Sequence, residues 1–395
     1  MTTDYDDSNI RVLEGLAAVR LYPGMYIGNT SAAGLHDLVY EVVDNSIEEA
    51  LAGYCKNIDI SINPNGSITV IDDGRGIEEE RTPQTGELSI EKIFTTLYSG
   101  KHRDCDCRIG GGLYGVGIAV VSALSAQVEV KVWRNQKIYT QRFERGIAVS
   151  VLVVEPSEQD RTGSSITFLP DLEIFTNGIE FDCDRLAHRF RQLAFVNAGV
   201  KISLADNRRA ALKLKESQAE NYYYPGGLRD YVVYLNADKQ PLHGDVIYAE
   251  TEKNQFRVEV ALQWCFDCQQ LILGFANTTE INEGVHLDGL KIAITRTITK
   301  IARQRNKLQS EEDSLVGACI NEGLTGIVSV LLPNPDWAGP TRTKLVNSEI
   351  PEIVDSIVSR TLTVYLESHP DIADAIIDRA IKSAEAAEIA SKELE

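Results

Sequence analysis

The sequence between residues 41 and 50, EVVDNSIEEA, combines a single asparagine with several acids at helical spacing. At about 100° per residue, these polar positions cluster on one side of a helix, and apolar residues occupy the other side. This acidic stripe consists of Asp37, Glu41, Asp44, Asn45, Glu48 and Glu49. Carboxylate and amide oxygens are the ligands that Mg²⁺ prefers, so the stripe could hold magnesium and a water molecule. The other interpretation, which the helical pattern leaves open, is the solvated face of an amphipathic helix.

Two further stretches have residue types that suit phosphate chemistry. IDDGRGI, residues 71–77, ends a predicted strand with two acids and continues with two glycines around Arg75. GGGLYGVGIAVVSALS, residues 110–125, is a glycine-rich loop that leads into an apolar helix, where backbone amides can surround phosphate oxygens. Glycines also form ordinary turns, and the loop lacks the G-K-[ST] of a P-loop and the preceding strand of a Rossmann fingerprint. Neither common nucleotide-binding fold therefore explains this combination.

The elements that must position these residues follow from hydrophobic periodicity. Residues 35–53 have a helical period that ends at Gly53, a suitable C-terminal cap. Residues 57–74 alternate on both sides of NPNG, which predicts a hairpin. Residues 126–155 alternate again, with turns predicted at Arg134-Asn135 and Arg145-Gly146, and residues 163–171 form a further strand. The pattern predicts an antiparallel-rich sheet that helices cover on one face.

The composition shifts near residues 222–227, and a second α/β domain is predicted beyond them. It should contain a strand over 256–265, a long crossing helix over 289–308 and a further strand over 324–335. Helices should follow over residues 348–394, with a break at His369-Pro370, and the last of them should act as a connector.

The composition is that of a globular chain long enough for two or three domains, with 395 residues of which 43% are apolar. The net charge of -19 argues against a general DNA-coating surface and leaves room for local basic patches. The acidic start, MTTDYDDSNI, is unlike a secretory signal, and no run of about 18 apolar residues exists, so we expect a cytoplasmic protein without a membrane partner.

The seven cysteines are an odd number in a long chain whose start is unlike a secretory signal, so no disulfide framework is predicted and reduced, mostly buried thiols are the expectation. An alternative is a zinc site formed by two pairs at unusual spacing, Cys105 with Cys107 and Cys265 with Cys268.

Seven stretches, in order, resemble the ATPase region of DNA gyrase B proteins and their topoisomerase IV counterparts, in the gyrase, Hsp90, histidine kinase and MutL superfamily. They are VRLYPGMYIGNT, EVVDNSIEEALAGYC, IDDGRGI, GGGLYGVGIAVVSALS, GSSITFLPD, YYYPGGLRDYV and LVNSEI. The resemblance runs over essentially the whole chain and implies an α+β protein. Residues 1–220 would form a GHKL (Bergerat) α/β-sandwich ATPase domain, with an N-terminal dimerisation arm over about residues 1–20. Residues 221–395 would form a ribosomal protein S5 domain 2-like transducer domain with C-terminal helices.

The resemblance implies ATP and Mg²⁺ as cofactors and gives individual residues roles. Glu41 would be the catalytic general base for the attacking water, and Asn45 would coordinate Mg²⁺. Asp72 would accept the adenine amino hydrogen, with Ser164 assisting through water. The other implied ATP contacts are Gly76, Ile77, Lys101 of the lid, the loop residues Gly111, Gly112, Leu113, Tyr114, Gly115, Val116 and Gly117, and Tyr5 from the partner's arm.

Glu49, Arg75 and Arg134 would lie at the mouth of the nucleotide pocket. For Glu49 and Arg75, a purely structural ion pair is equally compatible with the sequence. Arg134 matches a family arginine beside the adenine that contacts coumarin drugs.

The sequence departs from the family around the γ-phosphate. In GPTRTKL, Pro340 replaces a glutamine, and Arg342 replaces the lysine that reaches the γ-phosphate. Arginine is a wide planar fork and proline removes a backbone donor, so neither exchange is conservative. Tyr114 replaces a histidine, and the lid sequence SGKHRDCDCRIGGG is also unusual. We therefore expect nucleotide binding and leave the rate of hydrolysis, in which Arg342 would act, as an open question.

The leading hypothesis is the ATPase part of a type IIA DNA topoisomerase, in which MgATP closes a homodimeric clamp around transported duplex DNA. Arg296 matches a family arginine that lines the DNA cavity, although a simple surface charge explains it equally well. The metal-binding cleavage domain would follow residue 395, and a gyrase A-like subunit would supply the attacking tyrosine, so this chain alone should not cut DNA. The alternative is a short, non-hydrolysing paralogue that binds nucleotide and acts as a regulatory module.

Overall fold

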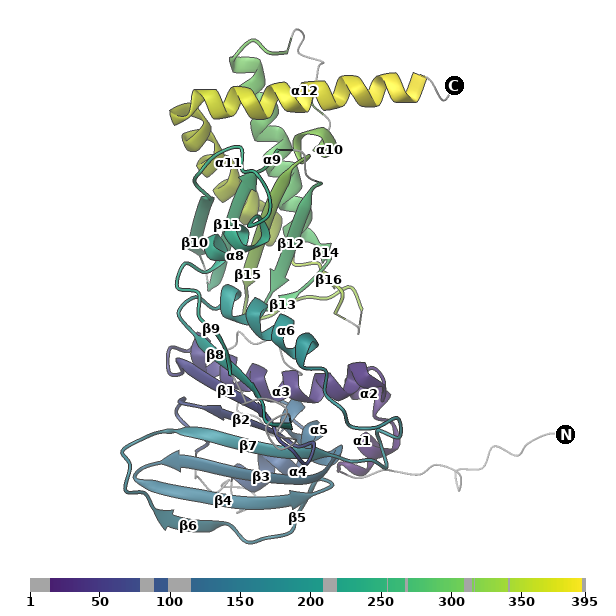
Figure 1. The fold of residues 1–395 in the computed structure, drawn as a ribbon, viewed down its shortest axis with the longest axis vertical. Coiled ribbons are helices and arrows are strands. Elements are labelled where there is room, and N and C mark those ends of the chain that lie inside the picture. The colour runs from purple at the N-terminus through teal and green to yellow at the C-terminus, as the bar shows by residue number, and fades with distance from the viewer. Residues whose placement is uncertain are drawn as a thin grey trace, which may run out of the picture. The chain divides into compact units, whose positions relative to one another are not determined.

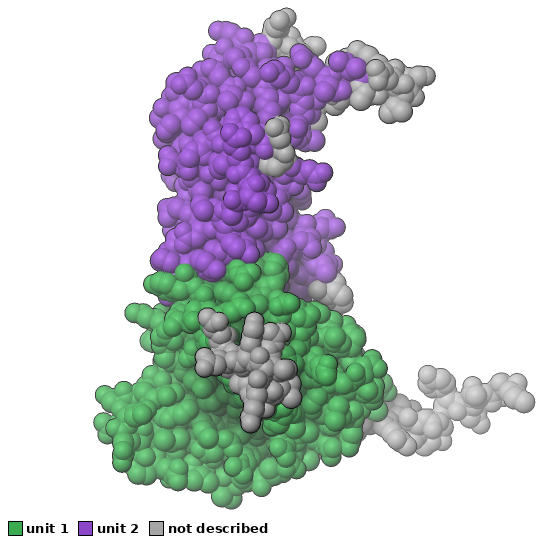
Figure 2. Space-filling view, viewed as in Figure 1, with its two compact units in different colours: residues 1–194, 200–223 green, residues 195–199, 224–395 purple. Residues whose placement is uncertain are grey.

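The computed structural model describes residues 15–78, 89–98, 115–208, 219–253, 255–266, 269–308, 315, 317–339 and 342–392. The chain divides into two compact units, which Figure 2 colours separately. Unit 1 comprises Met1–Ala194 and Val200–Tyr223, and unit 2 comprises Phe195–Gly199 and Tyr224–Glu395. Each unit has its own sheet and is described by itself.

A nine-stranded sheet forms the main layer of unit 1 (Figure 1). Its strands follow the order β5-β4-β3-β7-β2-β1-β8-β9, and β6 also pairs with β4. Every pairing is antiparallel except that of β1 with β8. The strands are β1 (Asn57–Ile62), β2 (Ile68–Asp72), β3 (Ser125–Arg134), β4 (Lys137–Glu144), β5 (Ile147–Ala148), β6 (Val153–Pro156), β7 (Gly163–Pro170), β8 (Lys201–Asp206) and β9 (Glu220–Tyr222).

The hairpins of this sheet confirm the predictions from periodicity. β1 and β2 pair antiparallel around the NPNG turn, with Ile62 opposite Ile68. β3 and β4 are joined through Asn135 and Gln136, both with positive φ (53° and 56°), as a two-residue type I′ turn requires. On β1 every second residue is buried, because one face of the sheet is covered and the other faces water.

The helices of unit 1 include the predicted helix that carries the acidic stripe, α3, which begins one turn earlier than predicted. The Ser31 hydroxyl accepts a hydrogen bond from the Ala33 N–H at its start, and Gly53, with a φ of 82°, follows its end as predicted. The helices are α1 (Ala17–Leu21), α2 (Gly24–Ile27), α3 (Ala32–Leu51), α4 (Ser89–Thr95), α5 (Gly117–Ala123) and α6 (Cys183–Val196), whose last two residues belong to unit 2.

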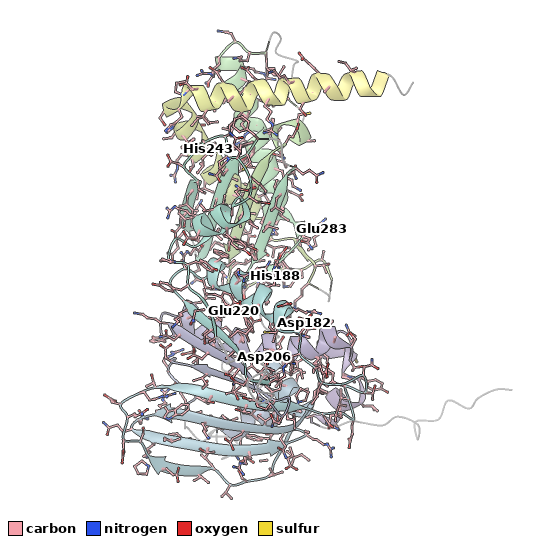
Figure 3. The ribbon with its side chains drawn as sticks, in the orientation of Figure 1. Asp182, His188, Asp206, Glu220, His243 and Glu283 are labelled. Atoms are coloured by element: carbon pink, nitrogen blue, oxygen red, sulfur yellow. The ribbon has the colours of Figure 1, made fainter. Side chains whose placement is uncertain are left out.

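Helix α6 has no counterpart among the elements predicted from the sequence. Asp182, labelled in Figure 3, caps it, because its Oδ1 accepts hydrogen bonds from the N–H groups of Asp184 (3.0 Å) and Arg185 (3.2 Å). The guanidinium of Arg189 lies 5.9 Å from the ring centre of Tyr40 on α3. Helix α6 therefore brings positive charge to the acidic stripe of α3.

Unit 2 is built on a five-stranded sheet of order β10-β11-β15-β12-β13, beside a separate parallel pair, β14-β16. Its strands are β10 (Ile247–Lys253), β11 (Phe256–Trp264), β12 (Leu271–Ala276), β13 (Thr279–Glu280), β14 (Glu283–Gly284), β15 (Leu324–Leu331) and β16 (Lys344–Leu345). The predicted strands over 256–265 and 324–335 are confirmed as β11 and β15.

The long helix of unit 2, α9 (Val285–Gln304), lies in the connection between β12 and β15, which pair in parallel. The sequence analysis took β11 as the strand before the crossing, and this was wrong in detail because β11 pairs antiparallel with β15. A parallel pair needs a long crossover, which α9 supplies. Buried side chains of α9, including Leu290, Ile294 and Ile298, belong to the main core of the unit.

The remaining helices of unit 2 are α8 (Leu228–Leu235), α10 (Gly317–Ile320), α11 (Ile350–Ser368) and α12 (Pro370–Lys392). The predicted break at His369-Pro370 is confirmed, because α11 ends at Ser368 and α12 starts at Pro370. Arg305 clamps α12 through two hydrogen bonds to Asp374, of 2.8 and 2.6 Å. In the described part of the chain, no helix has both the length and the apolar character to span a bilayer.

Candidate functional site

The carboxylate that ends β2, Asp72, accepts hydrogen bonds from four directions and is only 7% exposed. Its Oδ1 accepts from the N–H groups of Gly74 (2.9 Å) and Ser164 (3.3 Å). Its Oδ2 accepts from the hydroxyls of Ser46 (3.2 Å) and Ser164. Burial raises the pKa of Asp72, and the hydrogen bonds from Ser164, Gly74 and Ser46 oppose this rise.

This network brings together residues that are distant in sequence. β2 and β7 pair antiparallel with Asp72 opposite Ser164, so the sheet register sets their contact. Ser46 was missed by the sequence analysis, because it follows Asn45 on α3 and points to the sheet, away from the acidic stripe. Serine has no distinctive sequence signal at such a position.

Glu41 on α3 lies against the first residue of α5. A Cβ atom added to Gly117 would collide with Oε2 of the Glu41 carboxylate, so only glycine permits this approach. Gly115, two residues earlier, has a φ of 74°, and Val116 is 7% exposed. The structure therefore joins the acidic stripe to the described end of the glycine-rich loop.

Asn45 lies one turn after Glu41 on the same helix. Its amide nitrogen donates a hydrogen bond to the main-chain oxygen of Glu41. This bond fixes which way the amide group points. The amide oxygen of Asn45 thus remains the acceptor end of the group. An amide oxygen is among the ligands that Mg²⁺ prefers, so Asn45 fits that ion.

Glu49 and Arg75 form a bidentate ion pair. The Nε and Nη2 atoms of Arg75 donate to Glu49 at 3.0 and 2.8 Å, and the Arg75 N–H adds a third bond of 3.1 Å. Burial by itself raises the pKa of Glu49, but the bonds from Arg75 and the charges of Arg75 and Arg134 hold it below its usual value. The Arg75 guanidinium also lies 4.0 Å above the centre of the Tyr54 ring, a contact that sequence reasoning missed.

Arg134 holds the turn that follows Arg75. Its Nη1 donates to the main-chain oxygens of Arg75 (3.3 Å) and Gly76 (3.2 Å). Gly76 has a φ of 73°, and a Cβ there would lie 2.9 Å from Val132 Cγ1, so this position requires glycine. Ile77, the next predicted contact, is half-buried.

The burial of the other acids contradicts the interpretation of this stripe as a solvated helix face. Asp44 is only 7% exposed, and burial raises its pKa against the opposing charge of Arg189. Burial, together with the charges of Asp44 and Glu49, raises the pKa of Glu48 to about 8. Burial also raises the pKa of Asp37 to about 6, against the charge of Arg185. The helical pattern could not reveal this, because the surroundings of these acids, which include Arg185 and Arg189 of α6, come from distant parts of the sequence.

Unit 2 contains the remaining described site residues. Arg342 has a φ of 53° and lies between Gly339 and β16, so it belongs to a different unit from Glu41. Arg296 on α9 donates to Asp355 (2.6 Å) and Ser359 (3.0 Å) of α11 and is 60% exposed.

Several predictions lie outside the described residues. These are the ones on Tyr5, Lys101, Gly111, Gly112, Leu113, Tyr114 and Pro340, and on Cys105, Cys107 and Cys268 of the zinc alternative. The cysteines that the structure describes, Cys55, Cys183, Cys265 and Cys319, are free thiols, and no three metal-binding side chains gather among the described residues.

Comparison with known proteins places this arrangement in a family. A model described as "Histidine kinase-, DNA gyrase B-, and HSP90-like ATPase" matches residues 30–174, and one described as "DNA gyrase B" matches residues 227–395. The fold matches the 43K ATPase domain of Thermus thermophilus gyrase B, solved in complex with an aminocoumarin. The TM-score is 0.81 at 34% identity, over 97% of this chain and 98% of that one. The chain belongs to the DNA gyrase B family.

The family relationship extends along the whole chain. It is 51% identical to the DNA gyrase B protein of Synechocystis sp. over 99% of its own length, and 43% identical to that of Streptococcus pneumoniae over 97%. It spans 36% and 58% of these two gyrase B proteins. The ATP-binding domain of topoisomerase IV from Francisella tularensis matches with a TM-score of 0.78 at 27% identity, over 95% of this chain and 98% of that one. The predicted α+β fold, a GHKL ATPase domain followed by a transducer domain, is confirmed.

Proposed function

We propose that this chain is the ATP-binding and ATP-hydrolysing part of a gyrase B-like type IIA DNA topoisomerase. Residues 1–220 would act as the ATPase domain and residues 221–395 as the transducer. The observation that carries the proposal is the close approach of the Glu41 carboxylate to Gly117, which brings a general base to the end of a glycine-rich loop. The Asp72 network supports it with an acceptor suited to a nucleobase.

Asp72 would recognise the adenine amino group. Its carboxylate is held in place by Ser164, Ser46 and Gly74, and it accepts hydrogen bonds only, as an amino group requires. A nucleobase that presents an acceptor to Asp72 would leave two acceptors facing each other, which is costly in a buried site. Gly76 and Ile77, which follow on the same loop, would contact the base.

Glu41 would orient the attacking water and accept its proton, and Asn45 would hold magnesium through its amide oxygen. When bound, magnesium withdraws charge from the phosphate oxygens. Glycine at positions 115 and 117 would let the phosphates and the Glu41 carboxylate approach the same backbone. The loop residues 111–114 and Lys101 would complete the phosphate contacts, and Glu49, Arg75 and Arg134 would form the mouth.

The wider assembly is part of the same proposal. MgATP would close a homodimer, in which the arm over residues 1–20 carries Tyr5 to the partner's nucleotide, around a transported DNA duplex. Arg296 would face that DNA. The partners would be a gyrase A-like subunit and a cleavage domain, in the cytoplasm.

A second candidate, a non-hydrolysing gyrase B paralogue with a regulatory role, is favoured by the loop around Arg342. Arg342 replaces a lysine, and its φ of 53° is uncommon for any residue except glycine, asparagine and aspartate. Because a guanidinium is broader than an ammonium, it would contact the γ-phosphate differently. Such a protein would bind nucleotide and dimerise without turnover.

The experiment that separates the two candidates is steady-state ATP hydrolysis as a function of protein concentration. A working clamp should give a rate that rises faster than linearly with concentration, because the active form is a dimer. The Glu41→Ala variant should lose turnover and still form dimers with ATP. Binding of ATP without turnover in the unaltered chain would favour the regulatory module.

Asn45→Asp provides the matching test of nucleotide binding. The added negative charge next to the phosphates should weaken ATP binding by about a hundredfold or more, while the size of the side chain is unchanged. ATP affinity equal to that of the unaltered protein would contradict the role of Asn45 as a magnesium ligand.

A further inference from the structure

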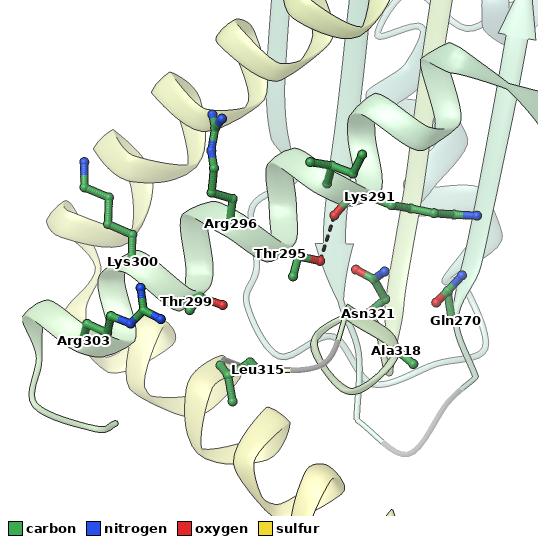
Figure 4. Close-up of a pocket in the computed structure, with 12 residues that line it drawn as sticks. Gln270, Lys291, Thr295, Arg296, Thr299, Lys300, Arg303, Leu315, Ala318 and Asn321 are labelled. Atoms are coloured by element: carbon green, nitrogen blue, oxygen red, sulfur yellow. Dashed lines mark hydrogen bonds between the residues drawn. The ribbon is translucent and has the colours of Figure 1, made fainter. Parts of the chain in front are cut away.

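Unit 2 contains a groove between α9 and α10, with a volume of about 780 Å³. Figure 4 shows Lys291, Thr295, Thr299 and Arg303 following one another along α9, with Asn321 and Gln270 beside them. These α9 residues are four apart, so they share one helical face. The volume lies in the range of small-molecule sites, about 300–1,000 Å³.

Two buried polar side chains in the groove have unused hydrogen-bonding atoms. Thr299 is 7% exposed and Asn321 is 4% exposed, and neither the Thr299 hydroxyl nor the Asn321 amide oxygen has a hydrogen-bond partner among the described residues. The hydroxyl of Thr295, one turn before Thr299, differs because it donates to the main-chain oxygen of Lys291 at 2.8 Å. Buried polar groups are normally paired, so these two atoms indicate a ligand that supplies their partners.

The rim of the groove is positively charged. Lys291, Arg296, Lys300 and Arg303 line it, and none of the lining residues that the structure describes is acidic. Arg296 is paired with Asp355, but Lys291 and Lys300 have no ion pair with any described residue. In a chain with a net charge of -19, such a cluster of cations favours an anionic ligand.

Part of the groove wall is apolar. Ile292, Leu315 and Ala318 contribute carbon surface next to the polar floor. An inorganic anion would contact the cations and leave this wall uncovered, whereas an organic anion would cover it. The Asn321 amide oxygen further requires a ligand with a hydrogen-bond donor, such as a hydroxyl.

We propose that the groove between α9 and α10 binds a small phosphorylated organic molecule. Its phosphate contacts Lys291 at the rim, beside Gln270 and Asn321 (Figure 4), and its hydroxyl groups reach Thr299 and Asn321 at the floor. This site goes beyond the proposed nucleotide site, because all its residues lie in unit 2 and none of them takes part in ATP binding. Success or failure of one proposal therefore leaves the other untouched.

The test uses ribose 5-phosphate, which carries a phosphate and several hydroxyl groups and has no base to occupy the site at Asp72. The full chain is labelled at its threonine methyl groups, and their NMR signals are followed during titration. The signals of Thr295 and Thr299 should shift and saturate together, and the signal of Thr297, on the opposite face of α9, should not. Neutral ribose should give no shift, and inorganic phosphate should bind more weakly than ribose 5-phosphate.

Two variants separate the floor from the rim. Thr299→Val keeps the shape and removes the hydroxyl, and it should weaken binding about tenfold, as followed at Thr295. Replacing Lys291 by Met, at an exposed position, should weaken binding by at least as much. Thr297→Val is the matched control and should bind normally, because its hydroxyl contacts Ser359 and lies outside the groove.

Three outcomes would overturn the proposal. The first is the absence of a saturable shift with ribose 5-phosphate. The second is binding that neither the Thr299→Val nor the lysine variant weakens, which would place the ligand elsewhere. The third is a shift of the Thr299 signal by a short DNA duplex but not by ribose 5-phosphate, which would assign the groove to the DNA backbone.

Discussion

Helices α3 and α9 are both twenty residues long, and each carries a stripe of polar side chains, yet the two stripes have different surroundings. On α3 the acid Asp44 is buried and Glu41 lies against Gly117 of α5. On α9 the cations Lys291 and Lys300 are exposed, and the buried member of the stripe is the uncharged Thr299. A helical stripe alone therefore does not determine its chemistry, which depends on the elements that enclose it.

The difference in enclosure has electrostatic consequences. The acids of α3 are desolvated, so the pKa values of Glu48 and Asp37 rise to about 8 and about 6. The cations of α9 keep their contact with water, and its ion pairs are those of a protein surface. Three changes test this contrast, and the first has the largest expected effect.

Gly117→Ala should reduce ATP turnover by about a hundredfold, with little change in stability. The added methyl group would occupy the position of the Glu41 carboxylate and push it away, and displacement of a catalytic group by about 1 Å costs about this much. The change in the free energy of unfolding should stay below about 1 kcal/mol, because a flexible side chain can move and alanine favours helix. Steady-state ATP hydrolysis and thermal unfolding measure the two effects.

Gly244→Ala is the matched control, because a Cβ there has no neighbour within 4 Å in the described part of the chain. It should leave turnover unchanged. Normal turnover in Gly117→Ala would mean that the position of Glu41 against α5 does not matter for hydrolysis, and α3 would then resemble α9.

The elements that position the site could be predicted because they depend on local signals. The helical spacing of apolar residues in α3 and the alternation of apolar residues in β1 and β2 around NPNG can be seen within short stretches of sequence. The sequence pattern predicts that the glycine at position 117 belongs to a phosphate loop, and this stays a prediction. Its close contact with Glu41, more than seventy residues away, could be expected from the resemblance and not from the pattern.

Other parts of the fold and site could not be predicted from the sequence, because they depend on distant partners. The parallel pairing of β1 with β8 joins residues far apart in the chain, and β8 was not recognised as a strand. Burial of Asp44 depends on surrounding elements such as α6, which was also not predicted. The same limit explains the buried, unpaired acceptor atom of Asn321 in the groove, whose position against α9 depends on the packing of α10.

Glu48→Gln should change how stability depends on pH. The pKa of Glu48 is about 8 in the folded protein and about 4.5 when the chain is unfolded, so the folded state holds its proton more tightly. The contribution of protonated Glu48 to the free energy of unfolding is at its maximum below about pH 4.5, and it is lost as the pH rises through about 8. Between about pH 5 and pH 9 the unaltered protein should lose about 4 kcal/mol more stability than Glu48→Gln, as measured by urea unfolding.

The control for this prediction is Glu352→Gln, which removes an exposed acid on α11 and should follow the unaltered protein at every pH. Parallel stability curves for Glu48→Gln and the unaltered protein would mean that Glu48 is as hydrated as an ordinary surface acid. The contrast between α3 and α9 would then be limited to Asp44 and Glu41.

The smallest effect is expected for the ion pair between α9 and α11. Nη2 of Arg296 lies 2.6 Å from Oδ2 of Asp355, but the arginine side chain is 60% exposed, so water and salt compete with the contact. A double-mutant cycle with Arg296→Ala and Asp355→Ala should give a coupling of about 0.2–1 kcal/mol, and it should decrease as salt is added. A coupling above about 2 kcal/mol that does not respond to salt would show that this pair is enclosed like the acids of α3. The ion pair of α9 would then depend on the elements that enclose it, as the stripe of α3 does.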